Sequence, residues 1–326
     1  TPIGMGLGPI NHFNTYKAFA GHFDGGGHTI TGKMVPVSQL DNKYNLYFGL
    51  FGICREFYNY PPPSVKNLNM AVSVDVQKAP IPKNGIYTGS LVGYGEGVEI
   101  ASCTNTGNVQ SGDLTADQLL YLCMGGMVGY LTSGSITDCE NKGEIRGGNI
   151  SPLTANAYIG GLVGHGYYIS AKGLTNRGKV YGAGYDTSFT GGIFGECMFN
   201  DSASELNNYS PIYGPEINVN EYYDDPMAFI GGIAGVMAEQ YDVKLTDVNN
   251  YADITGATFT GEHLGINKMH IGGLAGSCYV TEVRNASNTG KILATPVYNV
   301  IEEAYVGGLF GILSAAAVDC TNDGEV

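Results

Sequence analysis

The sequence lacks tryptophan, contains few charged residues and has no long apolar run. Charged residues account for only 14% of its 326 residues. A helix that spans a bilayer needs about 20 consecutive apolar residues, and no such stretch is present, so we expect no membrane insertion within this chain. No basic segment followed by an apolar one opens the sequence, as it would in a secretory signal. If the protein is exported, we expect its signal to have been removed before residue 1.

Basic residues are also scarce. Sixteen Lys and Arg residues stand against 30 Asp and Glu residues, which gives a formal net charge of −14. Nucleic-acid backbones are held mainly by Lys and Arg, so we expect no nucleic-acid partner. An anionic membrane surface is disfavoured for the same reason.

The familiar signatures of catalysis and metal binding are missing as well. The sequence has neither a His-Glu-x-x-His zinc motif nor a Gly-x-Ser-x-Gly nucleophile motif, and its six histidines are scattered. Its glycine-rich strings do not indicate a dinucleotide site, because no helices alternate with them. We therefore expect no catalytic residue, no cofactor and no metal.

The seven cysteines are an odd number and do not suggest a complete disulfide framework. Cys103, Cys139 and Cys320 fall at one position of a repeat, where Leu174 and Ala286 also occur. A position that accepts Cys, Leu and Ala favours a small buried apolar group, so we predict buried free thiols. A bond between stacked cysteines is the alternative. A second shared position, two residues past a glycine box, holds Cys54, Cys197 and Cys278.

Glycine, in contrast, is abundant, with 50 residues. Much of it belongs to a box of the form Gly-Gly-Leu-x-Gly that recurs in eight copies, spaced by 31 to 41 residues. Self-similarity at such a period is typical of repeat architectures. The boxes close at Gly52, Gly93, Gly129, Gly164, Gly195, Gly235, Gly276 and Gly311.

Most boxes are followed by a second motif, Asn-x-Gly-x-Val or Asn-x-Gly-x-Ile. In four copies the asparagine lies 12 residues past the closing glycine, which is a fixed spacing within a unit. Two further copies are blurred, around Asn207-Asn208-Tyr209 and around residues 248–254. The clean copies begin at Asn105, Asn141, Asn176, Asn288 and Asn322.

These patterns predict an all-β fold. Four to six apolar residues bounded by glycine indicate a short buried strand, and glycine costs a helix interior about 1 kcal/mol relative to alanine. Stacked at about 4.8 Å, such strands form a right-handed parallel β-solenoid of about eight repeats, with equivalent side chains in columns. Stacked asparagines could hydrogen-bond along such a column. A β-propeller is disfavoured because each of its blades needs four strands, and only two or three are recognisable in each unit.

We predict a single solenoid domain over residues 1–326. Residues 1–48 form its first coil or N-terminal cap, and residues 49–326 form the eight repeats. Variable connections join the units, and insertions at the same point of each coil emerge on one side of a solenoid. In one connection, residues 111–122, we expect a helical turn capped by Asp113.

The repeated box and its downstream Asn-x-Gly-x-Val motif resemble the GLUG repeat of bacterial surface proteins. That repeat also occurs in the non-catalytic region of IgA-cleaving metallopeptidases. The run FDGGGHTI, residues 23–30, resembles the segment that typically precedes GLUG repeats, with Gly26 in place of the usual asparagine. The resemblance covers nearly the whole chain. It implies an extracellular or cell-surface bacterial protein used for adhesion or scaffolding, and it implies no particular activity.

Acidic and aromatic residues gather in the longest connection, in the string NEYYDDP. We predict Tyr222, Tyr223, Asp224 and Asp225 there as ligand-binding residues, which could contact a sugar or bind calcium weakly. A solvated acidic loop is the alternative. Tyrosines of other connections either stack on a sugar or a partner, or cover the core with the hydroxyl in water; they are Tyr58, Tyr60, Tyr167 and Tyr168.

Three functions fit these observations. The preferred one is a non-enzymatic binding or scaffold module of the bacterial surface, whose partner is a host or self glycan or a surface protein. The second is a β-helix enzyme that acts on polysaccharide, which requires carboxylates from neighbouring turns about 5 to 9.5 Å apart in a groove. The third is a structural spacer of a larger protein. We also expect an open edge at the C-terminal coil, available for end-to-end contact.

Overall fold

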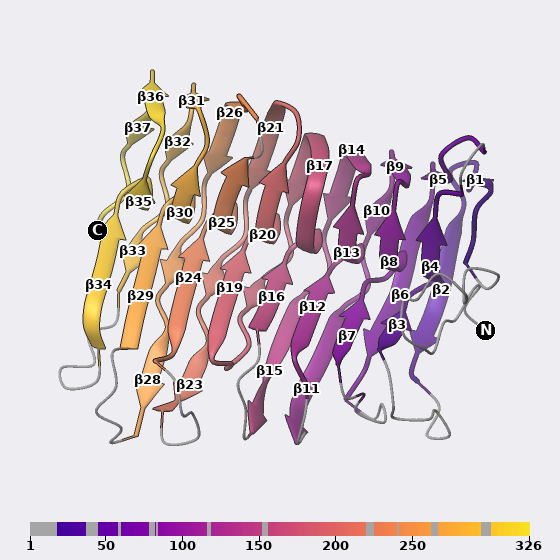
Figure 1. Cartoon of the computed structure of the whole chain (residues 1–326), viewed down its shortest axis with the longest axis horizontal. Helices are drawn as coiled ribbons and strands as arrows, with labels where there is room; N and C mark the ends of the chain where they lie inside the picture. The colour runs from indigo at the N-terminus through magenta and orange to yellow at the C-terminus, as the bar shows by residue number, and fades with distance from the viewer. Residues whose placement is uncertain are drawn as a thin grey trace.

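The computed structural model shows strands stacked into a parallel β-solenoid of about seven turns (Figure 1). The described residues form 37 strands and no α-helix, so the predicted fold class is confirmed. That part of the chain accordingly offers no helix long and apolar enough to cross a membrane. The structure describes residues 18–36, 45–57, 60–77, 82, 84–115, 119–151, 156–219, 225–239, 241–261, 267–294 and 301–326.

Each turn begins with two strands joined at a glycine box. The first strand belongs to an eight-stranded sheet, the lower stack, and the second belongs to the upper stack, which lies above it in Figure 1. Eight strands in the lower stack enclose seven complete turns, close to the eight repeats predicted. The lower stack contains β3 (Leu46–Phe48), β7 (Gly85–Thr88), β12 (Tyr121–Gly125), β16 (Asn156–Gly160), β19 (Thr187–Gly191), β24 (Met227–Gly231), β29 (Asn267–Gly272) and β34 (Ile301–Gly307). The upper stack contains β4 (Phe51–Arg55), β8 (Val92–Glu96), β13 (Val128–Thr132), β17 (Val163–Asn176), β20 (Phe194–Phe199), β25 (Ala234–Glu239), β30 (Ala275–Tyr279) and β35 (Phe310–Leu313).

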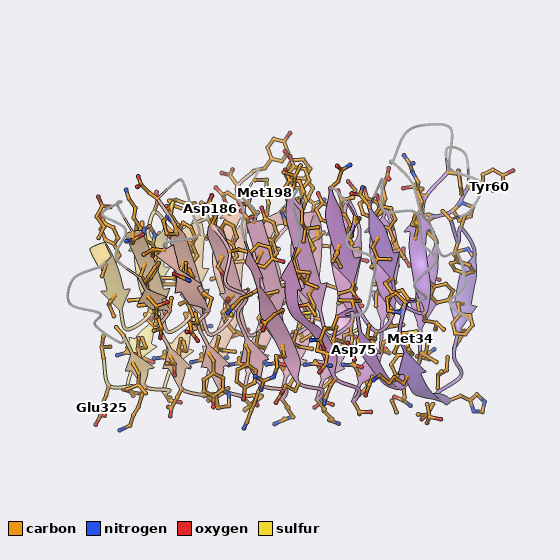
Figure 2. All side chains as sticks on the ribbon, turned by 90° about the horizontal axis from the view of Figure 1, so that it is seen from below. Met34, Tyr60, Asp75, Asp186, Met198 and Glu325 are labelled. Carbon is orange, nitrogen blue, oxygen red and sulfur yellow. The ribbon has the colours of Figure 1, made fainter. Side chains whose placement is uncertain are left out.

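The rest of each turn forms the opposing sheet, which closes the turn. β17 follows this path without a break, since it leaves the upper stack and ends in the opposing sheet at Asn176. In a view from below, Asp75 and Glu325 of the opposing sheet lie on one long face and Met198 of the upper stack lies on the other (Figure 2). Before the Asn-x-Gly corner the opposing sheet contains β1 (His22–Asp24), β5 (Ser64–Lys66), β9 (Glu99–Ala101), β10 (Thr104–Asn105), β14 (Ser135–Asn141), β21 (Ala203–Asn208), β26 (Lys244–Asn250), β31 (Glu282–Arg284), β32 (Ser287–Asn288), β36 (Ala316–Val318) and β37 (Thr321–Asn322). Through or after the corner run β2 (Thr29–Met34), β6 (Asn69–Asp75), β11 (Val109–Thr115), β15 (Ile145–Ser151), β18 (Val180–Tyr181), β22 (Ile212–Tyr213), β27 (Ile254–Thr255) and β33 (Ile292–Leu293).

Each turn encloses two separate apolar cores. Leu162 and Leu174 belong to the core between the upper stack and the opposing sheet. Ile159 and Val180 belong to the core between the lower stack and the opposing sheet. All four side chains are fully buried. The turn is pinched between the two cores, and we call this position the waist.

At the waist, the second glycine of the box packs against the asparagine of the second motif. A Cβ added to Gly161 would lie 2.7 Å from Asn176 and would collide with the carbonyl oxygen of Gly192 in the next turn. The same contact recurs between Gly126 and Asn141, Gly192 and Asn208, Gly232 and Asn250, Gly273 and Asn288, and Gly308 and Asn322. The two repeated motifs are therefore the two sides of one contact.

The waist asparagines form a hydrogen-bonded ladder along the solenoid. Asn176 Nδ2 donates to Asn208 Oδ1 at 2.8 Å, and Asn176 Oδ1 accepts from Asn141 Nδ2 at 2.9 Å. The same amide donates to Gly178 O at 2.8 Å and accepts from Gly178 N at 3.2 Å. Both donors and both acceptors of the buried amide are thus satisfied, which offsets the cost of burying it. The ladder confirms the predicted hydrogen bonding and runs through Asn105, Asn141, Asn176, Asn208, Asn250, Asn288 and Asn322.

The ladder ends at the first and last clean copies of the second motif, Asn105 and Asn322, and it also continues through the two turns in which the motif is blurred. Asn208 and Asn250 belong to it although their copies of the motif are blurred. Toward the N-terminus it stops, because Asn105 is in register with Met70, and Met70 with Ile30. Apolar side chains take the waist position in those first turns.

The cysteines are buried thiols, as predicted. All seven are free, and all except Cys320 are fully buried. Cys139 Sγ donates to Thr137 O at 3.1 Å, and Cys103 Sγ donates to Ala101 O at 3.3 Å. The residue before each of these two cysteines has a left-handed φ, so the thiol satisfies a carbonyl at a sharp bend of the opposing sheet.

Extra strands mark the side of the solenoid on which the connections vary. Asp113 lies in β11, so the predicted helical turn is wrong at this residue. Its carboxylate accepts a hydrogen bond from Asn149 N of β15 at 2.9 Å, which holds the two long strands together. Farther along the chain, β23 (Glu216–Asn218) pairs with β28 (Thr258–Thr260). These four strands extend below the lower stack in Figure 1, on the expected single side.

Removing one inner rung of the ladder is expected to destabilise the protein strongly. Asn176→Ala leaves buried polar groups of Asn141, Asn208 and Gly178 without partners, so we expect it to lower the free energy of unfolding by roughly 3 to 5 kcal/mol. Asn322→Ala, at the exposed end of the ladder, is the matched control and is expected to cost less than about 1 kcal/mol. Urea unfolding followed by circular dichroism measures both. Equal losses would show that the inner rungs contribute nothing beyond an exposed amide.

Candidate binding surface

At each Asn-x-Gly corner, alternate residues face outward from the opposing sheet. After Asn176, the residues Arg177, Lys179 and Tyr181 are exposed or half-buried, whereas Gly178 and Val180 between them are buried. Parallel stacking places the equivalent residues of neighbouring turns in three columns. The corner surface, as we use the term, comprises Lys142, Glu144 and Arg146; Arg177, Lys179 and Tyr181; Tyr209, Pro211 and Tyr213; and Tyr251, Asp253 and Thr255.

One outer column of the corner surface is a stack of rings closed by an arginine. Tyr181 and Tyr213 stack with their centroids 4.6 Å apart and their planes 11° apart. Arg146 Cζ lies 3.6 Å from the centroid of Tyr181 and covers that end of the stack. At the other end the next residue in register is Thr255. Because threonine is short, no ring among the described residues covers the far face of Tyr213.

The other outer column has the same construction, shifted by one turn. Tyr209 and Tyr251 stack with their centroids 4.7 Å apart and their planes 10° apart. Arg177 Cζ lies 4.2 Å from the centroid of Tyr209, and the position after Tyr251 is Thr289. The two tyrosines are 42% and 43% exposed, so the stack presents aromatic surface to solvent.

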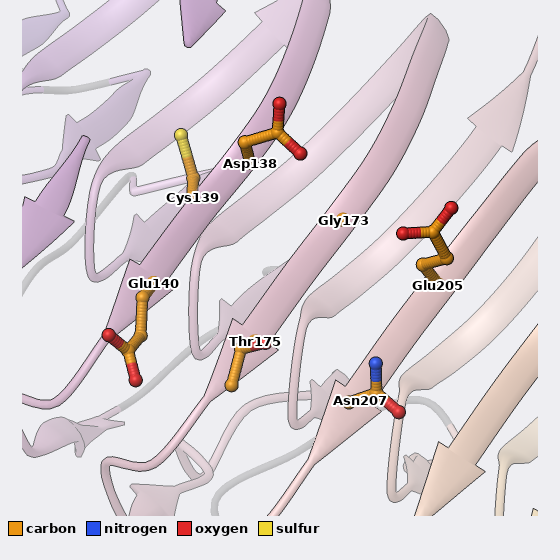
Figure 3. Close-up of a pocket in the computed structure, with 7 residues that line it drawn as sticks. All are labelled: Asp138, Cys139, Glu140, Gly173, Thr175, Glu205 and Asn207. Carbon is orange, nitrogen blue, oxygen red and sulfur yellow. The ribbon is translucent and has the colours of Figure 1, made fainter. Parts of the chain in front are cut away.

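A depression adjoins the corner surface on the opposing sheet (Figure 3). It has a volume of about 390 Å³. Gly173 lies between Asp138 and Glu205 of the neighbouring turns, and Asp138 Oδ1 lies 2.5 Å from the position that a Cβ of Gly173 would take, so the carboxylate leans over the glycine. It is lined by Asp138, Cys139, Glu140, Gly173, Thr175, Glu205 and Asn207.

Ion pairs join the depression to the corner surface. Glu140 accepts from Arg177 Nε at 2.9 Å and from Lys142 Nζ at 2.8 Å. Burial raises the pKa of Glu140, but the hydrogen bonds from Lys142 and Arg177 outweigh it, so the pKa lies below its ordinary value. Glu205 is paired with Lys172 at 3.3 Å. The depression therefore presents fixed carboxylates together with the amide of Asn207.

The carboxylate spacing bears on the enzyme hypothesis. Asp138 and Glu205 occupy equivalent positions two strands apart, which places their backbones roughly 9.6 Å from each other. Inverting glycosidases separate their carboxyl groups by about 6.5 to 9.5 Å, and their general acid needs a raised pKa. Glu140 has a lowered pKa and Glu205 is ion-paired. The arrangement suits hydrogen bonding to a ligand better than proton transfer.

A second group of rings lies at the bend between the lower and upper stacks and belongs to neither apolar core. Tyr158 stacks on Phe189 with centroids 4.8 Å apart, and on His165 with centroids 4.4 Å apart. The ring of Tyr130 meets His165 edge-on at 4.9 Å. Further members of this ring strip are Tyr47, Tyr87, Tyr94, Phe229, His270 and Tyr305. The strip packs the two stacks together from outside the turns.

His165 and Glu196 place two titratable groups in the ring strip. His165 Nε2 lies 3.7 Å from Glu196 Oε2, and the side chains are 16% and 24% exposed. Burial lowers the pKa of His165 to about 4 and raises the pKa of Glu196 to about 7. Between these values both groups are mainly neutral. Shifted pKa values often mark functional sites, but burial in the ring strip is the cause of both shifts here, so we assign them to packing of the two side chains and not to a ligand site.

Of the four predicted ligand residues, only Asp225 belongs to the described part of the chain, and it is not among the residues of the corner surface. Tyr222, Tyr223 and Asp224 fall outside the described residues. Asp225 is exposed and comes two residues before β24 of the lower stack. The predicted loop tyrosines are divided: Tyr58 is outside the described residues, Tyr60 is 68% exposed, and Tyr167 and Tyr168 contact each other at 4.0 Å.

Sequence reasoning missed the corner surface because its residues are the variable positions of a structural motif. The signal was available in the alternation of Asn-x-Gly-x-Val, which turns every x outward once the other positions are assigned to the interior. Reading those positions down the copies gives the run Lys142, Arg177, Tyr209 and Tyr251.

Neither the described side chains nor comparison with known proteins identifies a metal centre or a family. Within the described ranges, no group of three or more His, Cys, Asp or Glu residues could hold a metal ion. No protein-family model, curated protein or solved structure matches the chain.

The buried carboxyl of Glu196 predicts a pH dependence of stability. Its folded pKa of about 7 exceeds its ordinary value of 4.5, so the stability that its neutral form contributes is lost as the pH rises through 7. We expect Glu196→Gln to stabilise the protein by about 2 to 3 kcal/mol near pH 9, and by less than about 1 kcal/mol near pH 5.

Urea unfolding of wild type and variant at the two pH values measures the effect. His165 titrates in the opposite sense, since its lowered pKa costs stability as the pH falls below its ordinary value of 6.5. Comparing the two proteins at the same pH cancels that contribution. A stabilisation that does not change with pH would contradict the burial of the carboxyl.

Proposed function

We propose that this chain is a non-catalytic binding module of a secreted or cell-surface bacterial protein, and that its corner surface binds a glycan. The resemblance of its repeats to the GLUG repeat supports the location and the role in adhesion. The solenoid supplies a rigid rod on which binding residues repeat at fixed spacing, as in other stacked-repeat proteins with extended contact surfaces.

The observation that carries the proposal is the pair of arginine-capped tyrosine stacks. Tyr213 and Tyr251 each present a ring face, over Thr255 and Thr289, that no ring in the described part of the chain covers. The apolar face of a sugar ring packs on such a surface, and tyrosine also offers a hydroxyl to the polar rim of the sugar. The stacks are rigid before a ligand arrives, so binding costs little side-chain entropy.

The adjoining depression supplies the polar half of a sugar site. Asn207 offers an amide and Thr175 a hydroxyl, and the carboxylates of Asp138 and Glu205 accept hydrogen bonds from sugar hydroxyls. Few, fixed polar groups beside an apolar surface are typical of ligand sites. The surface is open rather than enclosed, which suits a long polymer.

A hydrolase is the second candidate, favoured by the spacing of Asp138 and Glu205. It is the weaker one, because Lys172 engages Glu205 at 3.3 Å and two cations hold the nearby Glu140 in its charged form. A purely structural spacer is the third and would show no ligand at all.

Removing the exposed rings tests the proposal. We expect a glycan array to retain the wild-type chain, and the double variant Tyr209→Ala, Tyr251→Ala to lose binding by a factor of about 10 to 100, because each stacked ring contributes on the order of 1 kcal/mol or more. Tyr279→Ala is the matched control, since Tyr279 is 44% exposed and lies in the upper stack. Retention that survives the double variant, or no retention of the wild type, would contradict the proposal.

A further inference from the structure

Charge on residues 138–179, which include all but Tyr181 of two of the four corners of the corner surface, differs in sign from the charge on the chain as a whole. Residues 138–179 contain five basic and three acidic residues, a net charge of +2, whereas the chain carries −14. The other residues together therefore carry −16. The basic residues of this stretch are Lys142, Arg146, Lys172, Arg177 and Lys179.

Lys179 is the cation of this group whose charge is not compensated. The residue in register with it in the preceding turn, Glu144, accepts from Arg146 Nη2 at 2.9 Å and from Arg146 Nε at 3.0 Å. Lys142 and Arg177 share Glu140. Lys179 is exposed and forms no ion pair within the part of the chain that the structure describes. Its three ammonium donors face solvent between the two tyrosine stacks.

The two arginines beside Lys179 keep donors to spare. Each guanidinium has five N–H groups. Arg146 uses Nε and one Nη on Glu144, and Arg177 uses Nε on Glu140. Both are held flat on a tyrosine ring, at 3.6 and 4.2 Å. The remaining N–H groups are therefore fixed in place, ready for a planar or tetrahedral anion.

On the basis of the proposed function, we infer that the ligand is an anionic polysaccharide, whose sugars carry a carboxylate or a sulfate. An anionic group binds at Lys179, with donors from Arg146 and Arg177, and sugar rings of the same chain pack on Pro211 and the tyrosine stacks. The outward positions of neighbouring turns repeat at about 4.8 Å. A polymer that lies along the solenoid axis therefore contacts the basic residues of the first turns and the tyrosines of the following turns.

A nucleic acid is the other common anionic polymer, and it fits less well. Each strand carries a charge about every 3.4 Å, which requires several uncompensated cations in a row. The corner surface offers one, and Asp253 lies two turns along the same column. A polysaccharide with one charge for every one or two sugars matches this pattern.

Two matched pairs of immobilised polymers test the inference on the whole chain: hyaluronan against its carboxyl-reduced form, and dextran sulfate against dextran. We expect binding to the charged member of at least one pair, about tenfold or more tighter than to its neutral partner, and weaker at high salt. The pair that responds identifies carboxylate or sulfate. Oligothymidylate serves as a nucleic-acid probe, and preferential binding to it would overturn the inference.

Lys179→Gln is expected to weaken binding to the charged polymer by about tenfold. Lys244→Gln is the matched control, because Lys244 is exposed, also lacks an ion pair within the described residues, and lies on the opposing sheet before its corner. Both substitutions are at exposed sites, and circular dichroism checks that the fold is kept.

The outcomes separate this inference from the proposed function. If charged and neutral members bind equally and the Tyr209→Ala, Tyr251→Ala variant loses both, the glycan site stands and the anionic class is wrong. An equal effect of Lys179→Gln and Lys244→Gln would also overturn it, since that result indicates non-specific attraction. If the chain binds neither these polymers nor any glycan of an array, both proposals fail.

Discussion

In six turns a glycine and an asparagine meet at the waist, and this contact sets the register of the stacked turns. It brings the two halves of a turn so close that no side chain fits at Gly161. Opposite this glycine, Asn176 uses both of its hydrogen-bond donors and both of its acceptor positions. A buried amide with any bond missing would cost about 1 to 3 kcal/mol, so each rung fixes the turns before and after it.

The asparagine ladder sets the register of neighbouring turns, and this register aligns the residues of the corner surface. Once Asn141, Asn176 and Asn208 lie above one another, the outward residues of their corners must lie above one another as well. The stacks of Tyr181 on Tyr213 and of Tyr209 on Tyr251 are consequences of this alignment. Interior positions are held by packing, whereas outward ones are not. Substitutions at the outward x positions of the Asn-x-Gly-x-Val motif can therefore change which ligand a solenoid binds without changing the fold of its turns.

The sequence was sufficient for the fold and insufficient for the surface. Repeated glycine boxes and asparagines predict stacked parallel strands because both residue types meet a backbone requirement that recurs in every turn. The division into two cores was not predictable, since a linear repeat does not show that Gly161 faces Asn176. The helical turn predicted at Asp113 was wrong because it considered only the local preference of Asp for helix N-caps, whereas β11 pairs with β15 at this point. The ligand-binding residues were predicted where acidic and aromatic residues are close together in the sequence of one connection. The corner residues are far apart in the sequence and come together only because the turns stack.

Hydrogen exchange of the asparagine side chains measures whether the ladder is closed in solution. In the chain labelled with ¹⁵N at asparagine, the Nδ2 protons of the buried waist residues Asn105 to Asn288 should exchange as slowly as backbone amides of the sheets, because each lies in a closed rung. The exposed amide of Asn149 provides the fast reference. Exchange of the waist amides at the rate of Asn149 would show that the ladder is not formed. The ladder could then not set the register of the turns or of the corner surface.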